Sequence, residues 1–510
     1  MKKILSVLFH RLTIVVFFIL LQALVLVAVI WRFSEYFVTF YSLNVLLSIF
    51  VLIDLVTGKR NPAYKLAWAV PILVLPIFGT LIYLVFGHNA VDTRNRIRGK
   101  AVYSRMERAN TTGAVLERLE LEDRTAAIQA RYINDHAWCP PFAGTETEYF
   151  PLGEVKLERL KQELEKAKRY IFLEYFIIEE GVMWSAILEI LARKAAEGLD
   201  VRVVYDDIGC MFTLPYRYDR ALEQMGIQCC VFNPFVPVLS SRFNNRDHRK
   251  IAVIDGYVAF TGGINLADEY INVREKHGHW KDSAVLLRGD GAWGFTVMFL
   301  ALWDSMRGAE EDLESFRPDP AGYPPTSGSG CVQPFNDGPN DYEAVGENVY
   351  MHLITKAKHY IYINTPYLIL DHEMTCALTL AAKSGVDVRI TTPHIPDKWY
   401  VHAVTRANYE VLLEGGVKIY EYTPGFIHAK SFVVDDNYGV VGTVNLDYRS
   451  LYLHFECGVW LYRADCLTDL KQDYLETQEL CTRITLEDCR RVAWYRKLGR
   501  KILSVFSPLM

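Results

Sequence analysis

Two stretches of the chain place a histidine, a lysine and an aspartate at the same spacing. Each reads His-x-Lys, followed after four further residues by Asp. The six candidate catalytic residues are His248, Lys250, Asp255, His428, Lys430 and Asp435. Alternation along each stretch predicts a strand that carries the histidine and the lysine on one face. Because roughly 0.04 chance matches are expected in such a chain, the pair indicates a shared chemical purpose.

Small residues and an asparagine follow each motif, as Gly262-Gly-Ile-Asn265 and as Gly442-Thr-Val-Asn445. A phosphodiester is an anion that repels an incoming nucleophile, so positive and hydrogen-bonding groups must surround it. Lysine ammonium groups can supply the charge, and asparagine amides can donate to phosphate oxygens. We therefore predict phosphodiester chemistry, with Gly263, Asn265, Thr443 and Asn445 as candidate substrate-binding residues.

The paired histidines suit a two-step exchange at phosphorus. One neutral imidazole can attack phosphorus and form a covalent phosphohistidine. The other, when protonated, can give its proton to the leaving alkoxide and later take one from the incoming alcohol. We expect no metal ion and no other cofactor, because the sequence contains no carboxylate cluster that would hold a metal. The sequence does not distinguish the nucleophile from the acid.

Each imidazole also needs a partner that fixes its tautomer. Glu456 lies 28 residues after His428, and Asp282 lies 34 residues after His248. Both acids follow a small-x-Asn turn by one short strand. We assign them as orienting carboxylates, and the alternative is that they are ordinary surface acids.

The residues beyond about position 150 repeat themselves. Lys166-Ala-Lys-Arg-Tyr-Ile-Phe-Leu is matched by Lys356-Ala-Lys-His-Tyr-Ile-Tyr-Ile, and Gly198-Leu-Asp-Val-Arg-Val by Gly385-Val-Asp-Val-Arg-Ile. In each half, strands alternate with helical stretches, which predicts an α/β fold with a mostly parallel sheet covered by helices. Two like halves placed face to face would form a cleft between them.

Composition divides the chain into five parts. We expect a membrane region at 1–90, a basic linker at 91–150, a first α/β half at 151–316, a Pro-, Gly- and Ser-rich linker at 317–330, and a second half at 331–510. The second half ends in a basic tail with apolar residues between its arginines and lysines. That tail is either an amphipathic helix on anionic lipid or a docking helix of the body.

The amino-terminal region contains three hydrophobic segments, at 12–31, 38–56 and 66–86. The first is long enough to span a bilayer. The third is interrupted by Pro71, Pro76 and Gly79, which suits a kinked or re-entrant segment. Basic clusters flank all three, so the positive-inside rule favours two crossings and a re-entrant third segment. We expect a multi-pass protein of the cell membrane whose catalytic body lies on the cytoplasmic face.

The paired motifs resemble those of the phospholipase D superfamily, and nearly the whole chain is similar to bacterial cardiolipin synthases. The resembling segments include 62–68, 76–79, 83–87, 172–178, 262–265 and 445–450. The resemblance implies a duplicated phospholipase D-like α/β/α sandwich, with two similar halves sharing one active site, behind an amino-terminal helical membrane region.

The resemblance also implies a reaction between two phosphatidylglycerol molecules. One loses glycerol and leaves its phosphatidyl group on a histidine, and a hydroxyl of the second then attacks to give cardiolipin. In the family the first motif usually supplies the nucleophile, which here is His248, and His428 is then the acid and later the base. The implied partners are phosphatidylglycerol, anionic membrane lipids and the bilayer itself.

Several alternatives share these motifs. A hydrolase would use water as the acceptor, and a phosphatidylserine synthase would use serine. A nuclease is disfavoured because the formal net charge is −5 and hydrophobic segments precede the body, so we expect no nucleic-acid partner. An inactive membrane scaffold is disfavoured because both motifs are complete.

Overall fold

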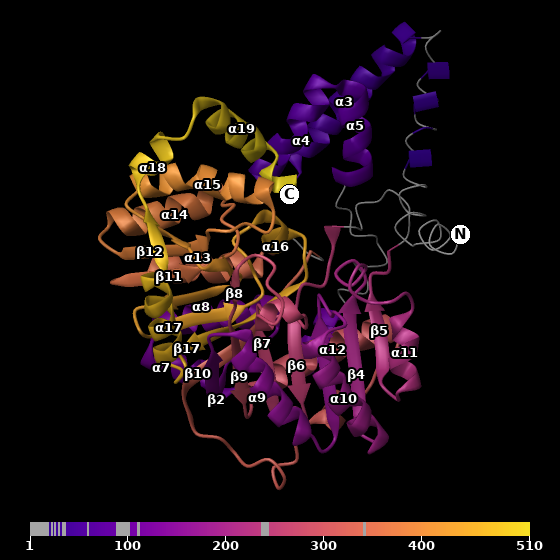
Figure 1. Cartoon of the computed structure of the whole chain (residues 1–510), viewed down its shortest axis with the longest axis vertical. Coiled ribbons are helices and arrows are strands. Elements are labelled where there is room, and N and C mark those ends of the chain that lie inside the picture. The colour runs from indigo at the N-terminus through magenta and orange to yellow at the C-terminus, as the bar shows by residue number, and fades with distance from the viewer. Residues whose placement is uncertain are drawn as a thin grey trace.

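The computed structural model describes residues 37–58, 61–87, 102–109, 113–235, 244–339 and 343–509, together with short stretches between 20 and 32. The molecule consists of two α/β halves with a group of helices at one end (Figure 1). The predicted segment 12–31 lies largely outside the described residues.

The first half is built on a seven-stranded sheet with the order β2-β9-β7-β6-β3-β4-β5. Its strands are β2 (Glu146–Phe150), β3 (Tyr170–Tyr175), β4 (Asp200–Asp206), β5 (Gln228–Phe232), β6 (Lys250–Ile254), β7 (Val258–Gly262) and β9 (Ala284–Arg288). Its helices are α9 (Gly153–Glu165), α10 (Val182–Ala196), α11 (Tyr218–Gln224) and α12 (Ala292–Arg307).

The second half carries a nine-stranded sheet with the order β1-β10-β17-β16-β15-β11-β12-β13-β18. Its strands are β1 (Phe142–Gly144), β10 (Gly328–Asp337), β11 (Tyr360–Asn364), β12 (Asp387–Pro393), β13 (Lys418–Tyr422), β15 (Ser431–Val434), β16 (Tyr438–Gly442), β17 (Glu456–Tyr462) and β18 (Cys481–Ile484). Its helices are α13 (Val345–Lys356), α14 (His372–Lys383), α15 (Trp399–Glu414), α16 (Tyr448–Tyr452), α17 (Leu467–Glu479), α18 (Leu486–Arg490) and α19 (Trp494–Val505).

The two sheets confirm the predicted duplication. Strands β2-β9-β7-β6-β3-β4-β5 of the first half correspond, in the same spatial order, to β10-β17-β16-β15-β11-β12-β13 of the second. The expectation of mostly parallel sheets is wrong, because only β3-β4-β5 and β11-β12-β13 pair in parallel. The strand after each His-x-Lys motif instead returns as a hairpin, β6-β7 or β15-β16, beside the central strand. Both halves are therefore mixed α/β sheets.

The halves are joined by a hydrophobic core rather than by a flexible hinge. Helix α12 is buried along most of its length, and its side chains pack into a cluster drawn from both sheets. Phe172 stacks on Phe299 of α12 at 4.7 Å between ring centroids, and Val433 and Val459 of the second half belong to the same cluster. Burial of this much apolar surface favours one rigid body, in which residues of both halves keep fixed positions.

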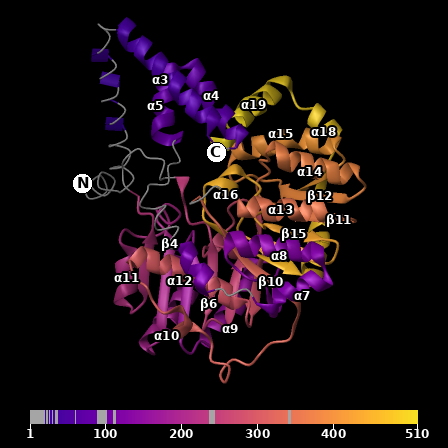
Figure 2. The ribbon, with the colours of Figure 1, turned by 180° about the vertical axis from the view of Figure 1, so that it is seen from behind.

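The segment 91–150 is more than the expected basic linker. Within it, α7 (Ala114–Glu122) and α8 (Arg124–Ala137) pack against the second half beside α13 (Figure 2). Asp123 ends α7 and caps α8 by accepting from the backbone N–H groups of Thr125 and Ala126. The amphipathic face of α8 then buries Ile133 in the second half's core. The prediction underestimated this segment because its basic residues masked the apolar stripe.

The described amino-terminal helices are α3 (Phe37–Thr57), α4 (Pro62–Val74) and α5 (Pro76–Ile82), the last continued by a short π-helical turn (Tyr83–Gly87). The predicted break in segment 66–86 is confirmed, because α4 ends at Val74 and α5 folds back along it. The hydroxyl of Tyr64 donates to the Gly87 carbonyl, and Trp68 packs edge-on against Tyr83. Gly79 allows α5 to approach α4 closely, since a Cβ there would lie 2.2 Å from the Pro71 carbonyl oxygen.

Among the described residues, no helix is both long and apolar enough to cross a membrane. The number of crossings stays a prediction.

The helical region docks on the second half next to the Asn445 turn. Tyr64 stacks on Tyr448 of α16, with ring centroids 5.6 Å apart and planes 7° apart. Asn61, which caps α4, donates to Asp371 at 3.2 Å and to the Tyr452 hydroxyl at 3.0 Å. The helices are thus attached to the part of the body that follows the second motif.

Candidate active site

Backbone pairing between the halves places each motif histidine next to the other half. The N–H of His248 donates to the Phe455 carbonyl at 2.8 Å, and the N–H of His428 donates to the Lys281 carbonyl at 2.6 Å. A two-stranded parallel ribbon, β14 (Gly425–Ile427) with β8 (His279–Lys281), extends the second of these contacts. Because Phe455 and Lys281 each precede a carboxylate, this pairing fixes which acid meets which imidazole.

The two imidazole–carboxylate pairs cross between halves. The Nδ1 atom of His248 lies 3.0 and 2.9 Å from the two carboxylate oxygens of Glu456. The Nδ1 atom of His428 lies 2.7 Å from Asp282. Sequence spacing related each acid to the histidine of its own half, and the structure corrects that pairing. In both pairs Nδ1 is engaged, so Nε2 is the nitrogen left for a substrate.

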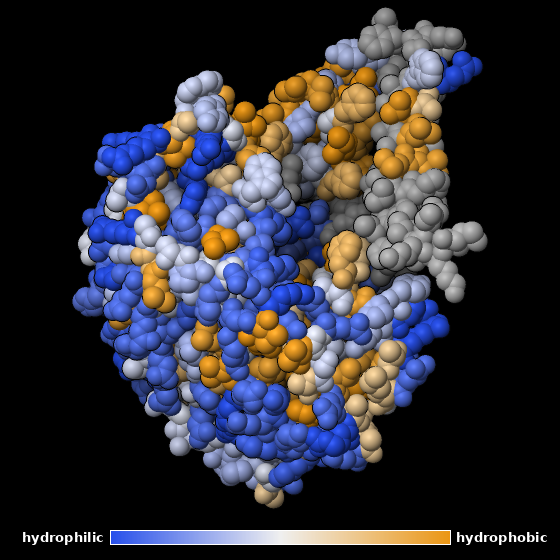
Figure 3. Space-filling model, viewed as in Figure 1, coloured by the Kyte–Doolittle hydropathy of each residue, from blue (hydrophilic) through white to orange (hydrophobic). Residues whose placement is uncertain are grey.

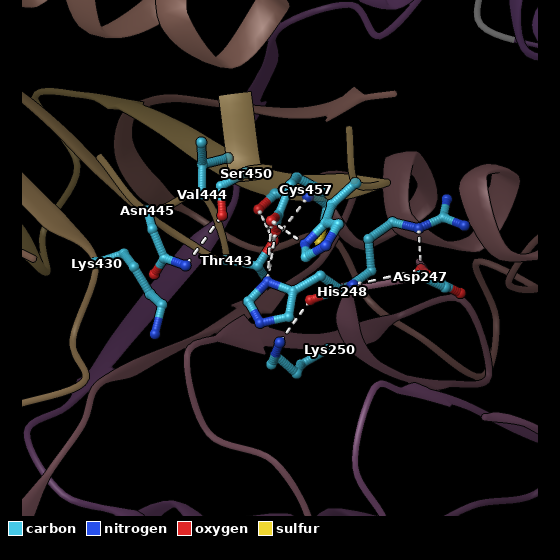
Figure 4. Close-up of polar contacts among 12 residues, drawn as sticks. Asp247, His248, Lys250, Lys430, Thr443, Val444, Asn445, Ser450 and Cys457 are labelled. Carbon is cyan, nitrogen blue, oxygen red and sulfur yellow. Dashed lines mark hydrogen bonds and ion pairs between the residues drawn. The ribbon is translucent and has the colours of Figure 1, made fainter. Parts of the chain in front are cut away.

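Both motif lysines are buried beside the histidines. The ammonium groups of Lys250 and Lys430 donate to the carbonyls of His248 and His428, the first at 2.5 Å. Burial lowers the pKa of Lys250 to about 8 and that of Lys430 to about 7, although Glu456 and Asp282 oppose the shift. Figure 4 shows His248 with Lys250 of its own half and with Lys430 of the other half in the same region. Both ammonium groups are therefore held in a poorly hydrated site, beside the two carboxylates.

The same environment keeps both imidazoles neutral in the free protein. Burial, followed by the charge of Lys250, holds the pKa of His248 well below its usual value. Burial and Lys430 lower the pKa of His428 to about 4, against the opposing effect of Asp282. A neutral imidazole is the form that attacks phosphorus. An anionic phosphodiester among these cations would raise both pKa values, which allows the second imidazole to act as an acid.

The motif aspartates lie at the opposite ends of their strands from the histidines. Asp255 accepts from the backbone N–H groups of residues 168–170 at 2.8 Å. Asp435 accepts in the same way from the N–H groups of residues 358–360, at 2.7 to 2.9 Å. Both carboxylates hold the turn that leads into the central strand. These contacts give both aspartates a structural role, and their expected catalytic role stays a prediction.

The two asparagines occupy equivalent positions but are held differently. The amide of Asn265 donates to the Tyr270 hydroxyl at 2.6 Å, and its oxygen accepts from the Ile177 N–H at 3.0 Å. The amide of Asn445 donates to Ser450 at 2.9 Å, and its buried oxygen has no partner among the described residues. Each amide keeps a second N–H hydrogen, so the expected donation to phosphate stays a prediction.

Gly263 lies against the Asp282 carboxylate, and Thr443 lies against that of Glu456. A Cβ at Gly263 would lie 2.1 Å from an Asp282 oxygen, so only glycine fits there. The Thr443 hydroxyl donates to Glu456 at 2.5 Å and lies 3.1 Å from the Cys457 carbonyl. Thr443 thus holds the Glu456 carboxylate and Gly263 leaves room for that of Asp282, and the expected contact of both residues with substrate stays a prediction.

Sequence reasoning missed His454 and Trp280, which occupy equivalent positions two residues before Glu456 and Asp282. The His454 ring lies 5.5 Å from the His248 ring, and the Trp280 ring lies 5.5 Å from the His428 ring. His454 is only 9% exposed, and neither ring nitrogen has a hydrogen-bond partner among the described residues. The repeat itself could have identified both, by aligning the residues before each carboxylate.

His248, His454 and Glu456 form the one group within the described residues that could hold a metal ion, with ligand atoms within 4.8 Å. The charge around them argues against a cation. Lys250 and Lys430 act on His248, and Arg449, Lys250 and Arg246 act on His454, in each case lowering the imidazole pKa after burial. This arrangement suits an anionic phosphate better than a divalent cation.

Two sheets of the same order, with paired histidines meeting between them, define the phospholipase D-like fold. The crystal structure of phosphatidylserine synthase from Haemophilus influenzae superposes with a TM-score of 0.58 over 76% of this chain and 100% of that one, at 15% identity. The description "Cardiolipin synthase, PLD-like domain" matches residues 160–279 and 350–477, and "Phospholipase_D-nuclease N-terminal" matches residues 46–88.

Full-length relatives agree with this assignment. The chain is 32% identical to a cardiolipin synthase of Halalkalibacterium halodurans, over 98% of this chain and all of that protein. It is 34% identical to one of Geobacillus kaustophilus, over 91% of this chain and 92% of that protein. An uncharacterized protein of Streptococcus mutans is 43% identical over 89% of this chain and 98% of that one. The chain belongs to the cardiolipin synthase family of phospholipase D-like proteins.

Proposed function

We propose that this protein is a cardiolipin synthase. It transfers the phosphatidyl group of one phosphatidylglycerol to a hydroxyl of a second and releases glycerol. The proposal rests on full-length similarity to relatives named cardiolipin synthase and on one observation in the site. That observation is the crossed pairing of His248 with Glu456 and of His428 with Asp282.

The crossed pairing supports a single composite site. Each half alone has a histidine without its orienting carboxylate, so neither half is competent by itself. Together they provide two oriented imidazoles and two buried lysines in one region. In-line displacement at phosphorus needs two such groups, one on each side of the phosphate.

The reaction proceeds in two displacements. In the first, Nε2 of His248 forms a bond to phosphorus, the bond from phosphorus to the glycerol oxygen breaks, and protonated His428 gives its proton to that oxygen. In the second, neutral His428 takes the proton of a phosphatidylglycerol hydroxyl. The hydroxyl oxygen then bonds to phosphorus, and the P–N bond to His248 breaks. The lysines hold the phosphate charge throughout.

The order of the two histidines follows the family resemblance, and their surroundings are compatible with it. Both imidazoles are neutral before substrate binds, which a nucleophile requires. The substrate's negative charge then favours protonation of the second imidazole.

The substrate places the protein at the cell membrane, and we propose that the body acts from the cytoplasmic face. Support comes from the basic residues that flank the hydrophobic segments. Exposed apolar side chains also gather over α3, α4 and α5 at one end of the molecule (Figure 3).

Product analysis tests the proposal. Purified protein in phosphatidylglycerol micelles should form cardiolipin and glycerol in equal amounts without added metal. His248→Ala and His428→Ala should each reduce turnover by about 10³-fold or more, because neither displacement can proceed without both imidazoles. Phosphatidic acid as the main product would contradict the proposal in favour of a hydrolase. Turnover that requires serine would indicate a different phosphatidyltransferase.

A further inference from the structure

The carboxyl-terminal helix α19 carries its apolar face outward. Its exposed residues recur at helical spacing and form one stripe of Trp494, Tyr495, Leu498, Ile502 and Val505. Trp494 is 76% exposed, and Leu498 and Ile502 are each about half exposed, at 51% and 53%. An amphipathic helix of a water-soluble surface normally turns such a stripe toward the core. The orientation of α19 therefore indicates that something outside the body covers this face.

The opposite face of α19 holds the helix on the body. Leu503 packs against a small cluster that contains Ile369, Val401 and Val404, and α19 lies along α15. Arg500 is on this inner side, where burial and the charge of Arg406 lower its pKa. The helix thus keeps an arginine partly buried while its tryptophan points into solvent. A helix that only docked on the body would instead bury its tryptophan and expose its arginine.

The charge of this segment selects one kind of partner. No acidic residue follows Asp488, whereas six basic residues do, namely Arg490, Arg491, Arg496, Lys497, Arg500 and Lys501. Within the described part of the chain, Arg496, Lys497 and Lys501 form no ion pair. A cationic rim around an aromatic and aliphatic stripe matches an anionic lipid surface, where the stripe enters the acyl boundary and the ammonium groups meet phosphates.

The position of α19 favours the same partner. It contacts α4 and lies at the same end of the molecule as α3, α4 and α5 (Figure 1). Those helices expose a further apolar set on the same end, including Phe50, Ile53, Leu66, Leu73, Val74 and Phe78. The twelve residues of α19 span about 18 Å, shorter than the roughly 30 Å hydrocarbon core, so the helix can lie on a bilayer but not cross it.

We propose that α19 is a membrane-surface helix that inserts its stripe of Trp494, Tyr495, Leu498, Ile502 and Val505 into an anionic bilayer. It gives the catalytic body a contact with lipid that is separate from the amino-terminal helices. The second half is then held to the bilayer at two places, through α4 and through α19. The proposal concerns lipid as a surface and does not depend on the transferase reaction.

Lipid photo-cross-linking tests the proposal on the full chain. The protein is placed, one copy per particle, in lipid nanodiscs containing phosphatidylcholine with a photoreactive acyl chain. A second set of nanodiscs also contains phosphatidylserine. Adducts are mapped by mass spectrometry. We expect adducts on residues 494–505 that increase severalfold with phosphatidylserine. The control is the peptide around Leu121, an apolar residue of α7 that is 90% exposed.

Charge variants sharpen the result. Lys497→Gln with Lys501→Gln should remove most of the phosphatidylserine-dependent increase, while Lys497→Arg with Lys501→Arg should retain it. The inactive His248→Ala variant should give the same adducts as the unmodified chain, so failure of the proposed reaction would not affect this outcome. The proposal is overturned if residues 494–505 carry no adducts while α3–α5 do. Equal adducts with and without phosphatidylserine, or on the Leu121 peptide, would also overturn it.

Discussion

The surroundings of His248 and His428 differ although the duplicated scaffold that holds them is the same. His428 is enclosed by aromatic rings, with Tyr270 and Trp280 each at 5.5 Å and Phe426 at 5.9 Å between centroids. His248 has Phe176 at 5.1 Å but also the imidazole of His454, whose Nδ1 lies 3.7 Å from Glu456. Duplication has therefore preserved the two imidazole–carboxylate pairs, while the residues next to them have diverged. The different surroundings of His248 and His428 are consistent with different roles for the two imidazoles.

After the two histidines themselves, the carboxylates should give the largest effects, because each acts on the histidine of the other half. Glu456→Gln and Asp282→Asn should each lower kcat by about 10²-fold, since the amide no longer stabilises the required tautomer and charge. Glu456→Gln should add little to His248→Ala, although the two residues lie in different halves. Steady-state rates of the single and double variants measure this coupling. Full additivity of Glu456→Gln with His248→Ala would contradict the crossed pairing.

The buried lysines should produce an alkaline loss of activity. Burial lowers the pKa of Lys250 to about 8 and that of Lys430 to about 7, so their positive charge falls as the pH rises through that range. We expect kcat/KM to decline about tenfold per pH unit above it, because the phosphate is then held by fewer cations. Lys430→Arg should move the decline to higher pH, whereas the surface change Lys161→Arg should not. A flat profile to pH 10 would show that the lysines stay charged.

His454 should have a smaller effect, specific to the His248 side. The variant His454→Phe removes the buried ring nitrogens and makes the surroundings of His248 resemble the aromatic surroundings of His428. We expect about a fivefold rise in KM for phosphatidylglycerol and a smaller change in kcat, because a lost hydrogen bond to bound substrate costs about 1 kcal/mol. His454→Gln should restore much of the loss, and Trp280→Phe should change KM little. An unchanged KM in His454→Phe would remove His454 from substrate binding.

The motif aspartates should affect stability more than chemistry. Asp255 is 1% exposed and also accepts a hydrogen bond from the Tyr323 hydroxyl, while Asp435 is partly exposed. Asp255→Ala should therefore lower the free energy of unfolding by about 3 kcal/mol and Asp435→Ala by about 1 kcal/mol. Denaturant unfolding measures the difference. Turnover per folded molecule should be nearly unchanged. A variant of normal stability that loses turnover would show that these residues take part in catalysis.

Local patterns predicted the duplicated fold and most of the site. The spacing of the His-x-Lys motifs identified His248, Lys250, His428 and Lys430, and the short strand after each turn led to Asp282 and Glu456. Sequence spacing related each acid to its own half, because the pairing depends on backbone contacts between chain segments far apart, with 208 residues between His248 and Glu456 and 146 between His428 and Asp282. The antiparallel return of β6 and β15 was missed for the same reason, since strand direction depends on tertiary partners.

The roles of individual residues were harder to predict than their presence. Gly263, Thr443, Asp255 and Asp435 belong to the repeated pattern, which marks them as important without saying what they contact. The structure shows that they brace carboxylates and turns. His454 was overlooked because it lies outside both motifs, although its position two residues before Glu456 matches that of Trp280 before Asp282. A repeat therefore predicts equivalence of position better than equivalence of function.

Trapping the covalent intermediate tests the central claim most directly. Protein mixed with labelled phosphatidylglycerol would be quenched by denaturation within one turnover, digested, and mapped by mass spectrometry under conditions that preserve phosphohistidine. The account predicts a phosphatidyl group on His248 in the unmodified chain, with its discharge to phosphatidylglycerol slowed in His428→Ala. Label on His428 would reverse the assigned order of the two histidines. Turnover to cardiolipin with no label on either histidine would contradict the two-displacement account altogether.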